Sequence, residues 1–375
     1  MKSKIAIFLI LFAFLGIKAQ NPDCVIKREV LYRPGDYGSL YYRIPAIITA
    51  KDGTLVAFTD KRKFNESDLP SDIDVVCNYS TDNGSSWSEP YTIAEGQGVG
   101  KGFGDVGVCH SLDDNGLIVV FTGGESIWKS TPEKSNRAYM ARSNDNGKTW
   151  TKPTDITHFI FGKSCNDSIR KNWYSSFFAS GNGLLTSKGR IMFVVAVKET
   201  NRNNLSNFVV YSDDNGVTWS VSERACGYGD EAKVVELQDG SILMSIRRHG
   251  QRAYNISYDG GITWKENISM WAEMTAPACN GDMIRYHYED DSTTRNVLLH
   301  SLPLGHARKN VTIFVSYDNG KTWPIHKVIV PYYSAYSSLC VLNDNTIGMY
   351  VEERLDDSKG YEMVFYQIDF KKLIE

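Results

Sequence analysis

An octapeptide of the form Ser-x-Asp-x-Gly-x-Thr-Trp occurs five times along this chain of 375 residues. In each copy the Asp carboxylate can accept hydrogen bonds from backbone N–H groups further along, and the Gly tolerates a positive φ. The Trp that ends the copy carries a large ring that can be buried to anchor the outgoing strand. Each copy therefore predicts a hairpin turn within a repeated β unit. The copies lie at residues 80–87, where Ser86 replaces Thr, and at 143–150, 212–219, 257–264 and 316–323.

A second series of turns alternates with these octapeptides, and each turn precedes an apolar strand. Its six members are spaced by about 58 residues, which is long enough for four short strands per unit. Helical periodicity is scarce, so the sequence predicts an all-β fold, a six-bladed β-propeller with four-stranded antiparallel blades. The sixth unit has no following octapeptide, and we expect residues 25–32 to complete the last blade. The turns and strands are 52–53 before 54–58, 115–116 before 117–121, 188–189 before 190–197, 239–240 before 241–247, 295–296 before 297–300 and 344–345 before 346–351.

The first twenty residues form a segment of a different kind. Lys2 and Lys4 precede an apolar run from residue 5 to residue 17 that is too short to span a bilayer. A basic start, a short apolar run and a small residue such as Ala19 are typical of a signal peptide. We expect residues 1–20 to be removed and residues 21–375 to form one domain that is secreted or periplasmic. No later segment is apolar for long enough to predict stable membrane insertion.

Charge and cysteine content narrow the class of function further. The formal net charge is −3, and no long block of one sign argues for nucleic acid or a polybasic membrane partner. The seven cysteines are scattered without a Cys-x-x-Cys pair, so neither a zinc site nor a redox motif is predicted. Their number is odd, which leaves at least one unpaired, and we expect most of them to be small buried apolar residues. Partners must therefore be sought in a binding site.

Arg43 lies in the run Tyr-Arg-Ile-Pro at residues 42–45, directly before the first blade. Together with the five octapeptides, this run resembles the bacterial sialidases, or neuraminidases, of glycoside hydrolase family 33, in which the octapeptide is known as the Asp box. The resemblance covers essentially the whole of residues 21–375. It implies a catalytic propeller domain, an exo-α-sialidase that hydrolyses terminal sialic acids with retention through a covalent tyrosine intermediate.

In that family three arginines from different blades hold the carboxylate of the substrate. The resemblance assigns Arg43, then Arg247 after a segment similar to the family's Glu-x-x-Val-Val-Glu-Leu-x-Asp-Gly, then Arg308 eight residues before the last Asp box. A guanidinium is a rigid fork that suits a carboxylate, and three clustered cations imply an anionic ligand. Arg285 and Arg295 are less well placed in the sequence.

The resemblance also supplies the acid/base group. Asp68 resembles the family's acid/base aspartate on a loop of the first blade, where it would protonate the leaving oxygen and later activate water. Asp72 and Asp74 are nearby alternatives. Arg62 resembles the arginine beside this aspartate that contacts the far edge of the sugar. Asp105 resembles the aspartate of an Asp-Pro motif at the same rim, although Val106 replaces the proline.

Tyr336 opens a Tyr-Ser-x-Leu run that resembles the segment bearing the family's nucleophile. Glu352, on the strand that follows, resembles the glutamate that orients an arginine, and Glu231 resembles the partner that takes the phenolic proton. A phenol suits this substrate because the reacting carbon already bears a carboxylate that would repel an Asp or Glu nucleophile. Tyr332 and Tyr333 are alternatives if the register differs.

The expected partners are sialylated glycoproteins, glycolipids or oligosaccharides, and the family's chemistry requires neither cofactor nor metal. Two other functions are compatible with the same motifs. One is transfer of sialic acid, either to another sugar or within itself, and the other is glycan binding by a non-catalytic Asp-box propeller. The presence of Asp68, Glu231 and Tyr336 favours an enzyme over a binding module. Trp128 could line a pocket for the N-acyl group, but a single Trp more often belongs to a core.

Overall fold

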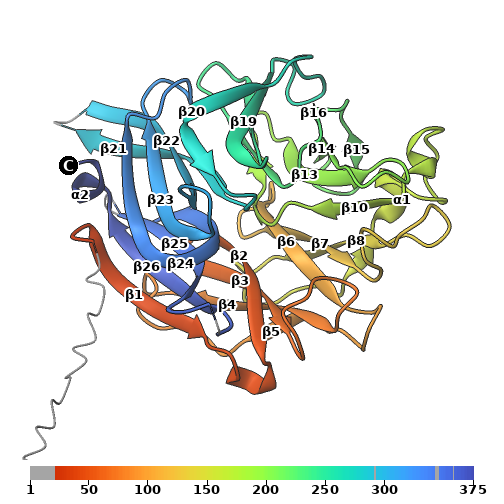
Figure 1. Ribbon diagram of the computed structural model, residues 1–375, viewed down its shortest axis with the longest axis horizontal. Helices are drawn as coiled ribbons and strands as arrows, with labels where there is room; N and C mark the ends of the chain where they lie inside the picture. The colour runs from red at the N-terminus through yellow and green to blue at the C-terminus, as the bar shows by residue number, and fades with distance from the viewer. Residues whose placement is uncertain (1–21, 291–292, 343–345, 358) are drawn as a thin grey trace, which may run out of the picture.

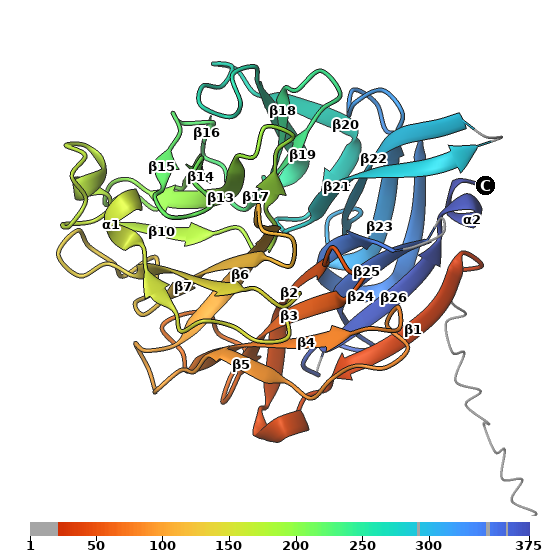
Figure 2. The ribbon, with the colours of Figure 1, turned by 180° about the vertical axis from the view of Figure 1, so that it is seen from behind.

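The computed structural model describes residues 22–290, 293–342, 346–357 and 359–375. Within these residues the chain forms six antiparallel blades around a central axis, so the predicted all-β propeller is confirmed (Figures 1 and 2). The predicted signal peptide at 1–20 and the turn at 344–345 lie outside the described residues. No helix in the described residues is long and apolar enough to cross a membrane.

Five of the blades in the described residues consist of strands that follow one another in the sequence, and the sixth is completed by the N-terminal strand. The innermost strand of a blade lies nearest the axis and the outermost strand lies at the rim. The first blade comprises β2 (Tyr41–Thr49), β3 (Leu55–Arg62), β4 (Ile73–Ser80) and β5 (Tyr91–Ala94), and the second β6 (Phe103–His110), β7 (Leu117–Gly123), β8 (Arg137–Ser143) and β9 (Thr154–Asp155). The third comprises β10 (Ser175–Phe178), β12 (Leu184–Leu185), β13 (Ile191–Lys198), β14 (Ser206–Ser212), β15 (Ser220–Val221) and β16 (Cys226–Gly227), while β11 (Gly181–Asn182) pairs in parallel with β6. The fourth comprises β17 (Ala232–Glu236), β18 (Ile242–Ile246), β19 (Gly250–Ser257) and β20 (Ser269–Ala276).

The last two blades share one long strand. The fifth blade contains β21 (Asp282–Asp290), β22 (Thr293–Pro303), β23 (Lys309–Ser316) and the first half of β24 (Ile325–Val341). The second half of β24 begins the sixth blade, which continues with β25 (Thr346–Arg354), β26 (Glu362–Asp369) and β1 (Val25–Tyr32). Residues up to Tyr333 of β24 pair with β23, and residues from Tyr333 onward pair with β25. Two predicted blades are thus joined into one seven-stranded hydrogen-bonded sheet.

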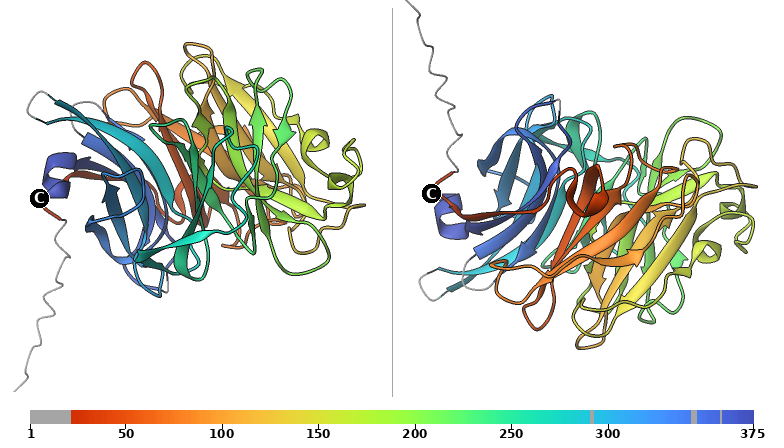
Figure 3. Two further views of the ribbon diagram at one scale, coloured as in Figure 1. Left: turned by 90° about the horizontal axis from the view of Figure 1, so that it is seen from above. Right: turned by 90° about the horizontal axis from the view of Figure 1, so that it is seen from below.

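The N-terminal strand closes the ring, as the sequence predicts. β1 pairs antiparallel with β26, and in the side views the red β1 lies against the blue strands of the sixth blade (Figure 3). An ion pair supports this junction, because Arg28 donates to Glu353, whose side chain is 2% exposed, and to Glu362 at 3.1 Å. The same Glu353 accepts hydrogen bonds from the hydroxyls of Tyr332 at 2.9 Å and Tyr366 at 2.5 Å.

The hydrophobic core is divided among the spaces between neighbouring blades. The middle strand β13 is buried along its whole length because a blade covers each of its faces. One apolar cluster fills each of the six interfaces formed by the described residues, and the cluster that contains Phe365 and Leu55 joins the last blade to the first. All seven cysteines lie in the described part of the chain, where they are buried and free, as expected of small apolar residues.

The Asp boxes form the turns that the sequence predicts. In the copy at 143–150, Asp145 accepts from the backbone N–H of Thr149 at 2.9 Å and from its hydroxyl at 2.6 Å, while Ser143 Oγ accepts from the N–H of Gly147 at 2.8 Å. Gly147 has φ 87°, and a Cβ there would lie 2.4 Å from Val56 of the preceding blade. Glycine is therefore required at this position both by the turn and by the contact between blades.

The closure of the ring predicts that Arg28→Ala lowers the free energy of unfolding by about 2–3 kcal/mol, because Glu353 loses its cation while it stays buried. Chemical denaturation monitored by tryptophan fluorescence measures this change. The matched control is Arg33→Ala, since Arg33 is exposed and lies 3.5 Å from Glu362, and its loss should cost about 0.5 kcal/mol or less. Equal effects of the two substitutions would contradict the role of Arg28 in closure.

Candidate active site

A cavity of about 210 Å³ opens at one end of the propeller axis. Seven of the nine predicted site residues line it, and Arg62 and Glu352 lie directly behind lining residues. A larger cavity of about 650 Å³ lies at the opposite ends of the same innermost strands and contains none of the nine. The seven lining residues are Arg43, Asp68, Asp105, Glu231, Arg247, Arg308 and Tyr336.

Irregularities in three innermost strands direct side chains into this cavity. The regular register of an antiparallel pair is interrupted between Arg43 and Ala46 in β2, between Gly104 and Gly107 in β6, and between Ser334 and Ser337 in β24. Ile44 and Asp105 have positive φ values of 60° and 61°, which are strained conformations for residues with a Cβ. Bulges of this kind turn a side chain away from its regular alternation and are frequent beside functional sites.

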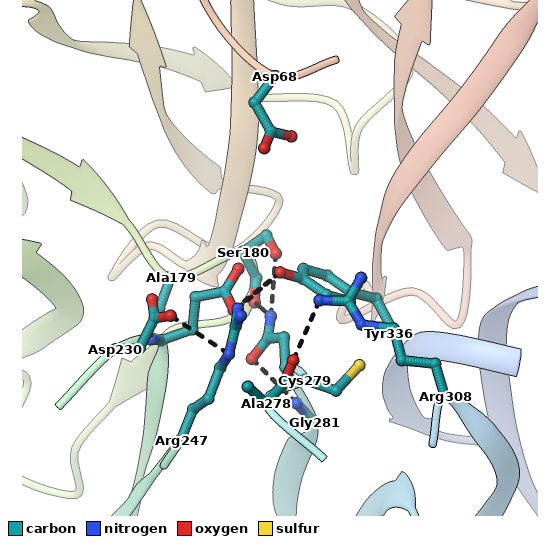
Figure 4. Close-up of polar contacts among 12 residues, drawn as sticks. Asp68, Ala179, Ser180, Asp230, Arg247, Ala278, Cys279, Gly281, Arg308 and Tyr336 are labelled. Carbon is teal, nitrogen blue, oxygen red and sulfur yellow. Dashed lines mark hydrogen bonds and ion pairs between the residues drawn. The ribbon is translucent and has the colours of Figure 1, made fainter. Parts of the chain in front are cut away.

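Tyr336 and Glu231 form the centre of the site. The hydroxyl of Tyr336 donates to Glu231 Oε2 at 2.9 Å, and Arg247 Nη1 also donates to Glu231 Oε2. The same Nη1 donates to the Tyr336 oxygen at 2.9 Å (Figure 4). Burial raises the pKa of Tyr336 well above its usual value, and the positive charge of Arg247 only partly opposes this. The phenol is therefore neutral at neutral pH, with a carboxylate in place to accept its proton.

Two further arginines approach the same tyrosine. Arg43 is held by the buried Glu352 through two parallel hydrogen bonds of 2.7 and 3.0 Å, a geometry that fixes the guanidinium plane. Arg308 donates to the carbonyl of Ala278 at 3.0 Å and forms no ion pair within the described residues. Both guanidinium groups lie near the Tyr336 ring, with centroid distances of 5.5 and 5.4 Å. Three guanidinium groups thus converge on one side of the cavity.

Asp68 approaches the cavity from a loop of the first blade. In Figure 4 it stands apart from the other side chains, and its carboxyl group is directed toward them. The side chain is 80% exposed, and its Oδ1 lies 2.7 Å from Nη2 of Arg62, which is fully buried. Desolvation by the surrounding protein opposes ionisation of Asp68, but the charges of Arg62 and Arg43 outweigh it and lower the pKa of this carboxyl. In the empty site Asp68 is therefore ionised.

The alternatives that the sequence leaves open occupy other places. Asp72 and Asp74 lie 3.1 and 2.9 Å from Lys63, and neither lines the cavity. Tyr332 donates to Glu353 at the junction with β1, and Tyr333 lies beneath Lys309. The geometry therefore favours Asp68 and Tyr336.

The two remaining arginines are also remote from the cavity. Arg285 lines the larger cavity at the other end of the axis, and Arg295 forms an ion pair with Asp290 on a hairpin of the fifth blade. No group of three or more His, Cys, Asp or Glu side chains in the described residues is arranged to hold a metal ion.

Comparison with known proteins identifies the family of the chain. Residues 44–362 match the family model described as a BNR repeat-like domain, which is most of the chain. The chain belongs to the sialidase family of Asp-box proteins. It is 29% identical to a sialidase of Bacteroides fragilis over 91% of this chain and 64% of that protein, and 32% identical to a sialidase of Micromonospora viridifaciens over 85% of this chain and 50% of that protein. This sialidase-family chain thus spans between half and two thirds of the length of these two relatives.

Solved structures show the same architecture. A Hadza microbial sialidase superposes with a TM-score of 0.81 at 26% identity, covering 92% of this chain and 69% of that one. An intramolecular trans-sialidase from Ruminococcus gnavus superposes with a TM-score of 0.79 at 17% identity, covering 94% of this chain and 99% of that one. At 17% identity the second likeness shows the propeller fold alone.

Several residues of this sialidase-family site are not predicted from the sequence. Asp230 lies 3.3 Å from Nε of Arg247, and burial, with the neighbouring Glu231, raises its pKa to about 6. Trp128 and Leu205 line the cavity, so Trp128 belongs to the site after all. Tyr361 places its ring 5.0 Å from the Arg43 guanidinium. The only sequence signal for Asp230 is its position directly before Glu231.

Asp60 is another buried member of the site. It accepts from the backbone N–H of Asp105 at 3.2 Å and lies 3.4 Å from Nη2 of Arg62. Burial raises the pKa of Asp60 to about 7 although Arg62 opposes the shift, and burial together with Asp60 raises that of Asp105 well above its usual value. Asp105 is partly exposed to the cavity, and the negative charge of each carboxylate opposes ionisation of the other, so the two shifts favour retention of a proton by this pair. The Asp105 carboxyl at the edge of the cavity can consequently donate as well as accept a hydrogen bond.

Proposed function

We propose that this chain is an exo-α-sialidase that hydrolyses terminal sialic acids from glycoproteins, glycolipids or oligosaccharides with retention of configuration. The observation that carries this function is the hydrogen bond of 2.9 Å between the Tyr336 hydroxyl and Glu231, placed among three arginines. Membership of the sialidase family supports a sialylated glycan as the substrate. We also propose that residues 1–20 direct the domain at 21–375 to the periplasm or the exterior.

Substrate binding begins with the carboxylate of the sugar. Arg43, Arg247 and Arg308 hold it, and Arg308 in particular has no carboxylate partner of its own in the described residues. Because Glu352 fixes Arg43 before the substrate arrives, little order has to be imposed during binding. The anomeric carbon that bears this carboxylate then lies close to the oxygen of Tyr336.

Chemistry proceeds by attack of the Tyr336 oxygen on the anomeric carbon as its proton passes to Glu231. A neutral phenol approaches the anionic substrate without the repulsion that a carboxylate would meet. The bond from the anomeric carbon to the leaving oxygen breaks, and Asp68 supplies the proton to that oxygen. Water then attacks the anomeric carbon of the sialyl-tyrosine, and the bond from that carbon to the Tyr336 oxygen breaks. Asp68 takes a proton from the attacking water, and Glu231 returns one to the departing phenolate.

The protonation of Asp68 depends on the bound substrate. In the empty site the charges of Arg62, Arg43 and Arg308 all favour its ionised form. A substrate carboxylate on Arg43 and Arg308 neutralises part of that charge, and the sugar displaces water from the loop. Both changes raise the pKa of Asp68, so it gains a proton when a proton donor is required.

The test of this function is release of sialic acid from α2,3-, α2,6- and α2,8-linked substrates, with NMR of the first sugar formed. We expect the α-anomer first, because two displacements restore the original configuration. Release of the β-anomer first would discard the covalent mechanism. Formation of an anhydro sugar or of a sialylated acceptor would show that the chain transfers sialic acid. If no substrate gave any product, the chain would be assigned as a propeller that binds glycans without hydrolysing them.

Asp68→Ala should lose activity chiefly on substrates with poor leaving groups. An activated aryl sialoside needs little proton donation, so its kcat/KM should fall about tenfold less than that of a natural sialoside. The control is Asp72→Ala, which removes a carboxylate of the same loop that pairs with Lys63 and does not line the cavity. The role of Asp68 as the acid is wrong if both substrates lose activity equally.

Tyr336→Phe should abolish most turnover, because the ring stays while the attacking oxygen is absent. A 2,3-difluorosialic acid should label the wild-type protein at Tyr336, since its fluorine at C3 slows breakdown of the adduct. Mass spectrometry of the peptide that contains Tyr336 reads out the site directly. A label on Tyr332 or Tyr333 would show that a different tyrosine is the nucleophile.

A further inference from the structure

Two cations are buried in the propeller interior behind the centre of the site. Lys233 and Arg252 are each 1% exposed, and neither has a carboxylate oxygen within 4.0 Å in the described part of the chain. Lys233 Nζ donates to the backbone carbonyls of Ser180 and, at 3.3 Å, Ala179. Neutral backbone groups are therefore the direct partners of the lysine charge.

Arg252 is held in the same way. Its Nε donates to Ser245 Oγ at 2.8 Å and its Nη1 to the carbonyl of Cys279 at 3.0 Å, while Nη2 is buried and has no acceptor among the described residues. Lysine and arginine are seldom fully buried unless they are paired, because removal of a charge from water is costly. Burial lowers the pKa of Lys233 to about 8 and that of Arg252 to about 10, so both stay predominantly charged at pH 7. Two positive charges are thus buried in the fold, and neither forms an ion pair within the described residues.

The position of these charges relates them to Glu231. Lys233 is two residues beyond Glu231, which directly precedes β17. The backbone carbonyl of Glu231 accepts from the N–H of Arg247 at 2.9 Å and so extends the β17–β18 pairing by one residue, which places the Glu231 and Lys233 side chains on the same side. Lys233 is opposite Ser245 in the next strand, and Ser245 binds Arg252. Both cations interact electrostatically with Glu231 from the interior, whereas Arg247 reaches it from the cavity.

The other ionisable groups around Lys233 are already hydrogen-bonded, neutral or paired elsewhere. Asp282 of β21 attracts Lys233, but its Oδ2 already accepts from Asn182 at 2.6 Å and from Ser338 at 2.8 Å. His300 of β22 binds Ser245 Oγ through Nε2 at 2.7 Å, and burial keeps its pKa well below the usual value, so it is neutral. Asp230 pairs with Arg247, and Arg252 of β19 repels Lys233. Asp105 of β6 interacts with Glu231 itself, and the two carboxyls oppose each other's ionisation.

We propose that Lys233 and Arg252 are positioning residues that keep Glu231 ionised after the substrate carboxylate has engaged Arg247. This inference rests on the proposed sialidase function. In the empty site Arg247 contacts Glu231, but a bound carboxylate shares that guanidinium and weakens its hold on Glu231. The two interior charges are out of reach of any ligand, so they act on Glu231 equally before and after binding. Glu231 consequently remains able to accept the proton of Tyr336 in the complex.

The test compares the pH dependence of kcat and of kcat/KM for the wild type, Lys233→Met and Lys233→Arg. Loss of the charge makes Glu231 easier to protonate, so in Lys233→Met the acid limb of kcat should move to higher pH by about one unit. The shift in kcat/KM should be smaller, because Arg247 still supports Glu231 in the free enzyme. KM should change less than twofold, and Lys233→Arg should restore the limb. An unmoved acid limb in Lys233→Met would overturn the inference.

A second variant should move the acid limb of kcat in the opposite direction. Asp282→Asn removes a negative charge from the same interior and should move the acid limb of kcat to lower pH. It also serves if Lys233→Met fails to fold, because an unmoved limb in Asp282→Asn contradicts the inference equally. The control for net charge is Arg190→Met, whose ion pair with Asp213 lies on an outer hairpin, and its acid limb should stay in place.

Thermal unfolding separates this role from a structural one. Because Lys233 lacks a carboxylate partner, Lys233→Met should melt at the same or a higher temperature than the wild type while its kcat at pH 5 falls about tenfold. A lower melting temperature with an unmoved acid limb would assign Lys233 to folding alone. Absence of sialic acid release by the wild type would overturn the proposed function and this inference with it. An active wild type with unmoved limbs in the variants would overturn the inference alone.

Discussion

The pairing of β1 with β26 is the contact on which the rest of the structure depends. It joins the two ends of the described chain, and only a closed ring brings the first and last blades together at the axis. The site crosses this junction, because Arg43 of the first blade is oriented by Glu352 of the last. Glu352 also accepts from the backbone N–H groups of Ile44 at 2.7 Å and Tyr336 at 3.3 Å. Closure of the fold and assembly of the site are thus one event.

The site concentrates features that are unfavourable for folding. Positive φ at Ile44 and Asp105 is one such feature, and the raised pKa values of the neighbouring carboxyls at Asp60 and Asp105 are another. A third is the Arg308 guanidinium, which forms no ion pair within the described residues. The surrounding apolar clusters between blades compensate, because each blade buries both faces of its middle strands. A rigid frame of this kind holds charged groups in place before a substrate arrives, which is how preorganised electrostatic sites function.

Much of this could be predicted from the sequence because the fold is built from a repeated local signal. Each Asp box forms its own turn from hydrogen bonds within eight residues, so its presence specifies a hairpin without knowledge of the rest of the chain. Arg43, Tyr336 and Glu231 could be assigned through motifs that surround them. Spacing and the preceding Asp-Lys-Arg run at residues 60–62 favour Asp68 over Asp72, but they do not predict how the loop folds over the cavity. Asp60 and Arg252 were missed because their roles arise from neighbours distant in sequence.

The shared strand β24 determines which contacts of the site lie within one sheet and which cross between sheets. Arg308 directly precedes β23, Tyr336 lies on β24 and Glu352 lies on β25, so all three belong to one continuous hydrogen-bonded sheet. Glu231 and Arg247 belong to the separate sheet of the fourth blade. The hydrogen bond between Tyr336 and Glu231 therefore crosses from one hydrogen-bonded sheet to another. Its length depends on how the fourth blade packs against the sheet that carries Tyr336, whereas the spacing of Tyr336 and Glu352 is fixed by strand pairing within one sheet.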